Sequence, residues 1–320
     1  MFKSAHDALH RWYQTNGRHN LPWRKTDDPY RIWVSEIMLQ QTQVRTVLER
    51  FYHPFLEAFP TLQDLAEADL DDVLKQWEGL GYYTRARNLH NAAKMASPRL
   101  PQTVNELHAL PGIGKSTAHA VAAFAYHTPV PIMDANVKRI LYRIFAIEKA
   151  SDKQLWEHAY RLFDEERPYD YNQSMMDLGA MVCTARNPQC DACPFHTVCL
   201  GKETPSSFPA KRAKKSVPVR RKTIVVHHYE GRYGLQQRQS RFLHGLWGFA
   251  EYDTVDTSAM QHLGSVTQKY SHFTLEGEVF LHRQSHNAME WFDAAQIGRL
   301  ALSKADQKVL KLIGSIEPLS

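Results

Sequence analysis

Residues 110–116 read LPGIGKS, a turn sequence with two glycines that is central to the helical part of the chain. Runs with helical periodicity lie on both sides of it, so we expect it to join two helices. Gly112 and Gly114 permit positive φ angles or a close approach to the backbone, which is more than a simple turn needs. If a helix begins near Lys115, its free backbone N–H groups and dipole can hold a phosphate, and the lysine adds positive charge.

A carboxylate follows this turn by about twenty residues. The sequence VPIMDANVKR, residues 130–139, places Asp134 between an apolar run and the start of a basic helix. An aspartate at such a position is typical of a helix N-cap, so capping is the simple interpretation and a catalytic carboxylate is the alternative.

All four cysteines of the chain lie between residues 183 and 199, with the spacing C-x6-C-x2-C-x5-C. Thiolates gathered by one short loop can converge on a metal centre. Zinc ribbons usually carry a short cysteine pair at both ends, which this spacing lacks, so an iron–sulfur cluster fits better. Zinc, or no metal at all, remain the alternatives. The candidate ligands are Cys183, Cys190, Cys193 and Cys199.

The composition describes an ordinary globular protein. The 320 residues are 43% hydrophobic and 23% charged, which excludes collagen, a coiled coil and wholesale disorder, and the length predicts two domains. No apolar run approaches the ~20 residues that a membrane helix needs. The first residues, MFKSAHDALHRW, are too polar for a signal peptide. We therefore expect a soluble, cytoplasmic protein.

A basic segment separates two kinds of sequence pattern. Residues 201–222 hold eight basic residues, one acidic residue and three prolines, which is typical of a solvated linker or of a contact with a polyanion. Short β-branched runs begin at Thr223, and a last helix is expected over residues 303–313. The predicted domains are therefore an all-α domain over 1–200, a linker over 201–222 and an α+β domain over 223–320.

The G-x-G turn, Asp134 and the cysteine loop together resemble the helix-hairpin-helix, Gly-Pro-Asp family of base-excision DNA glycosylases. Three longer stretches, LPWR (21–24), WVSEIMLQQTQV (33–44) and WEGLGYYTRARNL (77–89), resemble its MutY adenine-DNA glycosylase branch. The resemblance implies a two-lobed helical domain with a [4Fe-4S] cluster loop. Ser116 stands where endonuclease III relatives carry a Schiff-base lysine, which implies a monofunctional glycosylase.

The implied reaction removes adenine that is mispaired with 8-oxoguanine or guanine in double-stranded DNA. The resemblance implies a monomer that acts in the bacterial cytosol, associated with the nucleoid. Glu36 lies in an apolar helix that raises its pKa, so we assign it as the acid that protonates adenine, and Asp134 as the anion that stabilises the sugar cation. A solvated glutamate is the plain alternative for Glu36.

Substrate contacts follow from the same resemblance. An adenine must leave the duplex to reach an active site, and side chains fill the gap that it leaves. The matched residues are Leu21, Trp23, Arg24 and Gln173 at the adenine pocket, Gln41, Leu80 and Tyr82 as gap-filling residues, and Gly112, Gly114, Lys115 and Ser116 at the backbone-binding hairpin. Arg85, Arg87, Lys138 and Arg139 are candidate phosphate contacts, or simply a solvated face.

The second domain resembles the Nudix-like, MutT-like domain of MutY. Residues 268–273, QKYSHF, resemble the Phe-Ser-His loop with which that family recognises 8-oxoguanine, through Tyr270, Ser271 and His272. The glutamate-rich helix of a working Nudix hydrolase is missing, so this domain should recognise and not hydrolyse. Gly248 and Ala135 depart from residues that are frequent in the family, but neither change removes a catalytic group. His19 stands where some relatives have an arginine near the site, so no contact is assigned to it.

Two other functions stay open at this point. One is an endonuclease III-like glycosylase/lyase on oxidised pyrimidines, which Ser116 and the second domain oppose. The other is a non-catalytic, redox-sensing iron–sulfur protein that binds DNA.

Overall fold

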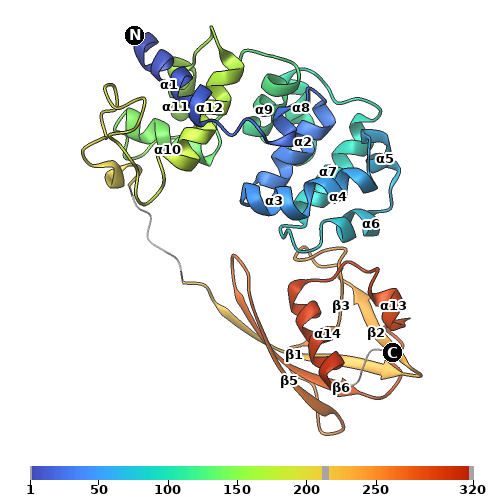
Figure 1. Ribbon diagram of the computed structural model, residues 1–320. Coiled ribbons are helices and arrows are strands. Elements are labelled where there is room, and N and C mark those ends of the chain that lie inside the picture. The colour runs from blue at the N-terminus through green and yellow to red at the C-terminus, as the bar shows by residue number, and fades with distance from the viewer. Residues whose placement is uncertain (1, 211–215, 317–320) are drawn as a thin grey trace. The chain divides into compact units, whose positions relative to one another are not determined.

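The computed structural model describes residues 2–210 and 216–316 (Figure 1). The chain forms two compact units, one made of Met1–Gln41 and Met95–Ala213, and the other of Thr42–Lys94 and Lys214–Ser320. Lys211, Arg212, Lys214 and Lys215 of the predicted basic linker lie outside the described residues.

The first unit is helical. Its helices are α1 (Lys3–Asn16), the 3-10 helix η1 (Pro22–Arg24), α2 (Pro29–Leu39), α8 (Val104–Ala109), α9 (Lys115–Ala125), α10 (Ala135–Ile144), α11 (Asp152–Leu162), α12 (Pro168–Met181) and the 3-10 helix η2 (Pro205–Ser207).

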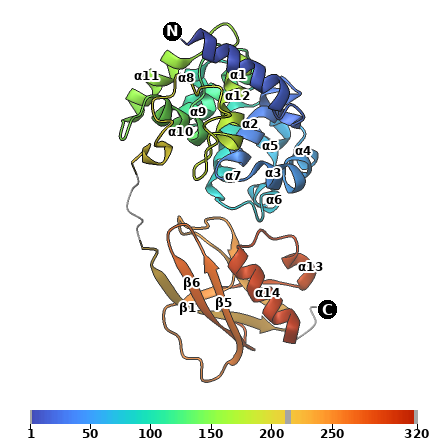
Figure 2. The same cartoon turned by 60° about the vertical axis from the view of Figure 1, so that its left-hand side comes forward.

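Side-chain caps set several of these helix starts. Asp28 accepts a hydrogen bond from the Tyr30 N–H, and Pro29 occupies the first turn of α2, where its missing N–H costs nothing. Ser151 and Gln154 form a reciprocal capping box at the start of α11. Helix α12 packs against α1, α9 and α10 (Figure 2), and it contributes Met175 and Leu178 to the core of the unit.

The second unit joins short helices to a mixed sheet. Its elements are α3 (Val44–Arg50), α4 (Tyr52–Ala58), α5 (Leu62–Glu67), α6 (Leu70–Gln76), α7 (Thr84–Ala96), β1 (Val219–Tyr229), β2 (Arg232–Gln237), β3 (Trp247–Gly248), β4 (Ala250–Tyr252), β5 (Gln261–Lys269), β6 (Thr274–His282), β7 (Glu290–Phe292), α13 (Ala294–Ile297) and α14 (Lys304–Ile316). Helix α7 ends just beyond the boundary between the units.

The sheet has the order β3-β2-β1-β6-β5, with β4 paired to β1 and β7 to β2. Strands β1 and β6 run parallel, and the other pairs are antiparallel. Helix α14 packs on β5, and Val309 and Ile313 join the core of the sheet. The predicted combination of a helical part with a C-terminal α+β part is confirmed.

Two predicted boundaries change. The first strand begins at Val219, not at Thr223, because residues 219–222 pair with residues 274–277 of β6 and so leave the predicted linker. The last helix is confirmed and begins one residue later, at Lys304. The predicted domain boundaries at residues 200 and 222 stay a prediction. The two compact units are divided differently from the predicted domains, since residues 42–94 belong to the same unit as the C-terminal sheet.

Candidate functional site

Glu36 lies on α2 among side chains that exclude water. Trp33 and Ile37 on the same helix are buried, and Glu36 itself is half-buried. Burial raises the pKa of Glu36 to about 7, the negative charge of Asp134 adds to the rise, and the Arg24 guanidinium opposes it. The Glu36 carboxyl therefore titrates near neutral pH, and it is close enough to Asp134 for the two carboxyls to influence each other.

Asp134 caps α10, as the simple interpretation predicts. Its Oδ1 accepts a hydrogen bond from the Val137 N–H at 2.7 Å, and its Oδ2 accepts one from Asn136 Nδ2 at 3.3 Å. Burial raises the pKa of Asp134, while these donors and the charge of Arg139 oppose that rise by favouring the carboxylate. Asp134 is thus at once an N-cap and the electrostatic partner of Glu36.

Two buried side chains fix the extended segment that leads to Asp134. Asn172 on α12 accepts from the Ile132 N–H and donates to the Val130 carbonyl, both at 2.9 Å. The His119 ring on α9 bonds the Pro131 carbonyl through Nδ1 at 2.8 Å. Because Asn172 and His119 are almost fully buried, they hold the backbone before Asp134 rigidly.

A buried ion-pair cluster lies beside this pair of carboxyls. Asp177, with no exposed surface, accepts from Arg24 Nη1 and Nη2 at 2.8 and 2.9 Å, and from the backbone N and Nε of Arg18, both at 2.8 Å. Burial would raise the pKa of Asp177, but the hydrogen bonds and charges of Arg24 and Arg18 outweigh it and hold that pKa below its usual range. The guanidinium of Arg24 is therefore bonded within the protein, and it acts on Glu36 through its charge.

The other residues predicted at the adenine pocket are buried as well. Leu21 precedes the 3-10 helix η1, Trp23 lies within it, and both are nearly covered; Gln173 on α12 is 2% exposed. The Oε1 atom of Gln173 has no hydrogen-bond partner within residues 2–210 and 216–316. A buried acceptor without a donor is costly, so Gln173 Oε1 is suited to an amino group that enters from outside.

The hairpin between α8 and α9 has the predicted form. Gly112 adopts φ +74°, whereas Gly114 has φ −74° and serves as the N-cap of α9, with open space where a Cβ would point. That space lets a ligand approach the N–H groups at the helix start. Lys115 departs from the prediction, because its Nζ lies 4.3 Å from the centre of the Trp156 ring. Ser116, the next residue, is half-buried.

The four cysteines converge, as the spacing predicts. Cys183, Cys190, Cys193 and Cys199 line one small cavity, together with Arg143 and His196. Arg143, itself buried, donates to the carbonyls of Cys183, Thr184 and Pro205 and lies 3.2 Å from the Cys183 sulfur. The loop is thus preorganised around a space that four thiolates share, which fits an iron–sulfur cluster.

Arg139 is not a free phosphate contact. Its guanidinium donates to the Cys183 and Gly179 carbonyls at 2.8 and 2.5 Å, and to Asn136 Oδ1 at 2.9 Å. Since Asn136 also bonds Asp134, Arg139 connects the cysteine loop with the start of α10.

The other predicted phosphate contacts also have internal partners. Lys138 forms an ion pair with Asp152 at 2.8 Å, and Arg87 donates to the His244 carbonyl at 2.6 Å. Arg85 lies over the Trp77 and Tyr82 rings, and burial lowers its pKa to about 10.

The predicted gap-filling residues differ in exposure. Gln41, in the first unit, is exposed with φ +59°. In the second unit Tyr82 is 48% exposed with φ +51°, and it follows Gly79 and Gly81, which also have positive φ angles. Leu80 is buried, so its side chain is not available for insertion in this conformation. Positive φ is costly for glutamine and tyrosine, and such strain is found at functional sites. Gln41 and Tyr82 are therefore better candidates than Leu80 for filling the gap left by adenine.

The loop over residues 270–273 presents two exposed side chains. Ser271 and His272 are exposed, and Ser271 Oγ lies 3.3 Å from His272 Nδ1. Tyr270 packs edge-on against Phe242, and it lies in one cluster with Phe273 and Ala305. The tyrosine therefore supports the loop from inside. The glycine at position 248 also has a structural explanation, because a Cβ there would clash with the Arg238 guanidinium.

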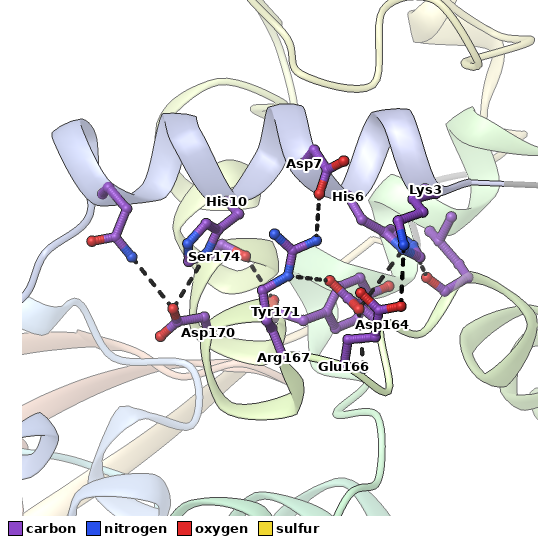
Figure 3. A network of polar contacts seen from close by, with 12 residues as sticks. Lys3, His6, Asp7, His10, Asp164, Glu166, Arg167, Asp170, Tyr171 and Ser174 are labelled. Carbon is purple, nitrogen blue, oxygen red and sulfur yellow. Dashed lines mark hydrogen bonds and ion pairs between the residues drawn. The ribbon is translucent and has the colours of Figure 1, made fainter.

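The N-terminal helix is tied to the helix that carries Gln173 and Asp177. Figure 3 shows the contacts from α1 to the residues before and within α12. Arg167 bonds Asp7 at 2.8 Å and Asp164 at 3.1 Å, and His10 lies 3.3 Å from Asp170. These contacts attach the start of α12 to α1, which also packs against α12 in the core.

Comparisons with known proteins agree with this geometry. Residues 34–165 match the model of the HhH-GPD superfamily base excision DNA repair proteins, and residues 183–199 match the iron-sulfur binding domain of endonuclease III. No helix within residues 2–210 and 216–316 is long and apolar enough to cross a membrane.

Several curated relatives are adenine DNA glycosylases. The one from Buchnera aphidicola subsp. Schizaphis graminum is 32% identical over 335 positions, which cover 94% of this chain and 96% of the relative. The human one is 40% identical over 61% of this chain and 39% of its own length. Among solved structures, a thermostable thymine-DNA glycosylase matches with TM-score 0.57 and 29% identity, over 62% of this chain and 94% of that one.

Proposed function

The chain belongs to the adenine DNA glycosylase family, and from this premise we propose that it removes adenine mispaired with 8-oxoguanine or guanine. It is a base-excision repair glycosylase that hydrolyses the N-glycosidic bond of adenine, and it carries the iron–sulfur domain of that superfamily. The choice of the opposite base, the roles of individual residues and the monomeric state are part of the proposal.

One observation supports the catalytic assignment: two carboxyls that influence each other lie in different surroundings, because Glu36 is enclosed by apolar side chains whereas Asp134 accepts two hydrogen bonds. Glu36 has a pKa of about 7, and Asp134 accepts hydrogen bonds that favour its ionised form. A departing base gains negative charge and the sugar gains positive charge, so the reaction needs an acid and an anion together. In the proposal Glu36 protonates adenine at N7, and the Asp134 carboxylate stabilises the oxocarbenium-like sugar.

In this proposal the surrounding residues position Asp134 and the adenine base, and they transfer no protons. Asn172 and His119 fix the backbone before Asp134, and the buried Gln173 Oε1 can accept a hydrogen bond from the exocyclic amine of adenine. Ser116 offers no amine at the hairpin, which supports a monofunctional glycosylase without Schiff-base chemistry. Gly112 and Gly114 would let the start of α9 bind the DNA backbone.

The cluster would be held by Cys183, Cys190, Cys193 and Cys199, in a loop that Arg143 organises. When bound it supplies a rigid, charged anchor and takes no part in the hydrolysis proposed here. Through Arg139 and Asn136, the backbone of the cysteine loop is bonded to the residue that caps α10.

Two relatives that match along nearly their whole length come from the bacterium Buchnera aphidicola, which supports a bacterial cytosol as the place of action. The C-terminal α+β part of the chain, as a Nudix-like recognition module, would contact the base opposite adenine. Its contacts would come from Ser271 and His272, which are exposed on one loop.

A single-turnover assay tests the function directly. It compares duplexes that hold adenine opposite 8-oxoguanine, adenine opposite guanine, and thymine glycol opposite adenine, with borohydride added to trap any Schiff base. We expect adenine release from the first two duplexes and no trapped complex. Cleavage of the thymine glycol duplex with trapping would instead favour the endonuclease III-like alternative.

The pH dependence of adenine release follows from Glu36. The reaction needs its protonated form, which predominates below a pKa of about 7. We expect the single-turnover rate to fall by about tenfold per pH unit above that value. At low pH the rate should fall again, because Asp134 must stay ionised. A rate that is flat between pH 6 and 9 would contradict the role of Glu36 as the acid.

Replacement of the exposed loop residues should change specificity. With Tyr270, Ser271 and His272 all replaced by alanine, we expect adenine release opposite 8-oxoguanine to approach the rate opposite guanine. Loss of two or three polar contacts corresponds to a change of about tenfold or more in that ratio. An unchanged ratio would mean that the opposite base is recognised elsewhere in the chain.

A further inference from the structure

We propose that Phe242 positions the recognition loop, residues 270–273, for the base opposite adenine. Phe242 lies in the segment of residues 238–246 between β2 and β3, here called the brace loop. Both loops belong to the second unit, although they are far apart in the sequence. The inference rests on the proposed function, and it adds a residue that determines specificity from outside the QKYSHF stretch.

The recognition loop is the turn of a hairpin between β5 and β6. A backbone hydrogen bond from the Tyr270 N–H to the Phe273 carbonyl, at 2.9 Å, closes this turn. Ser271 and His272 at its tip are exposed. Exposed side chains change rotamer readily, and ordering them costs free energy when a base binds. A group that orders the loop beforehand would therefore strengthen recognition.

Phe242 contacts three of the four residues of the recognition loop. Its ring centre lies 5.0 Å from the ring centres of Tyr270, His272 and Phe273, at interplanar angles of 86°, 82° and 65°. Edge-on contacts of this kind are attractive beyond the area that they bury, and they favour particular ring orientations. The His272 ring also meets the Phe273 ring, at 4.8 Å and 73°. Phe242 and Phe273 thus restrict the orientation of the exposed imidazole.

These aromatic residues pack on a small cluster of their own. Phe242 and Tyr270 lie against three buried residues, Phe273, Leu275 and Ala305. The core of the sheet is a different cluster. Loss of the Phe242 ring should therefore disturb the recognition loop more than the fold of the sheet.

The brace loop holds Phe242 through its own backbone. The Gly245 N–H donates to the Arg238 carbonyl at 2.8 Å, which brings the two ends of the loop together. The Phe242 carbonyl accepts from Ser240 Oγ at 3.0 Å. Leu243, the next residue, has φ +56°, a conformation that is unfavourable for leucine and persists only where its surroundings hold it. The loop therefore has a defined conformation at the position of Phe242.

Ion pairs and a helix anchor the brace loop. The largely buried Arg238 pairs with Asp306 at 2.9 Å and with Glu251 at 2.6 Å. Arg87 on α7 donates from Nη1 to the His244 carbonyl at 2.6 Å. The guanidinium that the sequence offered as a phosphate contact thus supports the loop that carries Phe242.

The test compares two variants of Phe242 in the full chain. Phe242→Ala removes the ring, and Phe242→Tyr keeps it. Single-turnover adenine release is measured at saturating enzyme, opposite 8-oxoguanine and opposite guanine, together with the thermal midpoint of unfolding. For Phe242→Ala we expect the ratio of the two rates to fall by about tenfold, the combined effect of three ring contacts, with the rate opposite guanine nearly unchanged. Phe242→Tyr should retain the wild-type ratio.

An unaltered ratio in Phe242→Ala would overturn the proposal. An equal fall of both rates with a lower thermal midpoint would overturn it too, since a merely structural role predicts that result. Phe280→Ala is the matched control, which should leave the ratio unaltered. Phe280 is also half-buried, its ring lies 5.0 Å from that of His262, and the pair sits at the end of the β5–β6 hairpin remote from the turn.

Arg87→Gln tests the brace loop independently, and it keeps the proposal testable if Phe242→Ala fails to fold. Loss of the bond to the His244 carbonyl should lower the same ratio by about fivefold, the equivalent of one net hydrogen bond. A guanidinium that binds a phosphate would instead weaken the affinity for both duplexes equally and reduce its dependence on salt, which would overturn the role of the brace loop. A wild-type chain without preference for 8-oxoguanine would overturn the proposed choice of opposite base, and this inference with it.

Discussion

Asp134→Asn should bind a duplex with adenine opposite 8-oxoguanine but release adenine about 10³-fold more slowly than the wild type, or slower still. The amide has the same shape and can still accept from the Val137 N–H, so the cap on α10 survives. What disappears is the negative charge that stabilises the sugar cation. Single-turnover release and gel-shift affinity, measured on one duplex, separate the two effects.

The same variant should also change Glu36. The charge of Asp134 contributes to the rise in the pKa of Glu36, so the amide should let that pKa fall below about 7. The residual activity of Asp134→Asn should therefore decline at a lower pH than wild-type activity. Glu106→Gln, at an exposed acidic residue in the first turn of α8, is a control that should leave both rate and pH profile unaltered. Normal turnover by Asp134→Asn would remove Asp134 from the mechanism.

The sequence was sufficient to predict the motifs whose residues are adjacent along the chain. The G-x-G turn, the N-cap at Asp134 and the cysteine loop are each local, because capping, positive φ and ligand spacing depend on a few neighbouring residues. The resemblance to a family then predicted the activity, which the relatives support.

Contacts between distant segments could not be predicted in this way. Lys115 was expected to face a phosphate, but its ammonium lies over Trp156, forty-one residues later in the chain. Arg24 was expected to contact adenine, and its Nη1 and Nη2 atoms also bond Asp177 on α12, a partner that the sequence did not indicate. Such partners depend on how helices pack, and a basic side chain alone does not indicate whether it meets a carboxylate, an aromatic ring or water.

Several residues that shape the site were missed for the same reason. Asn172, His119 and Asp177 lie on helices at positions without a local motif. Asp177 did leave a signal, since it is an acidic residue inside the apolar run SMMDLGAM of α12. A buried carboxylate needs partners, so that pattern predicts a buried ion pair even when its partner is unknown.

The strand boundary at Val219 illustrates a second limit. Residues 219–222 follow a proline and hold three basic residues, and composition alone assigns them to a linker. They form a strand because β6 offers parallel partners, and because Arg221 and Lys222 find acidic partners at Glu276 and Asp253. Pairing of this kind depends on tertiary contacts and overrides local composition.

Asp177→Asn should destabilise the first unit by about 3 kcal/mol, because it leaves the buried Arg24 charge and the partly exposed Arg18 charge without their counter-ion. The expected result in a denaturant titration is a lower midpoint with an unchanged slope. Glu49→Gln provides the matched control, since it removes one carboxylate from a largely exposed pair with Arg45 and should cost well under about 1 kcal/mol.

The pH dependence of this loss tests its cause. The Arg24 and Arg18 guanidiniums hold the pKa of Asp177 below its usual range in the folded chain. Its contribution to stability is therefore present above the unfolded pKa of about 4 and is lost as the pH falls through the lower folded value. The difference between wild type and Asp177→Asn should be full at pH 7 and shrink in acid. A difference that is constant down to pH 3 would show that packing, and not charge, is what Asp177 contributes.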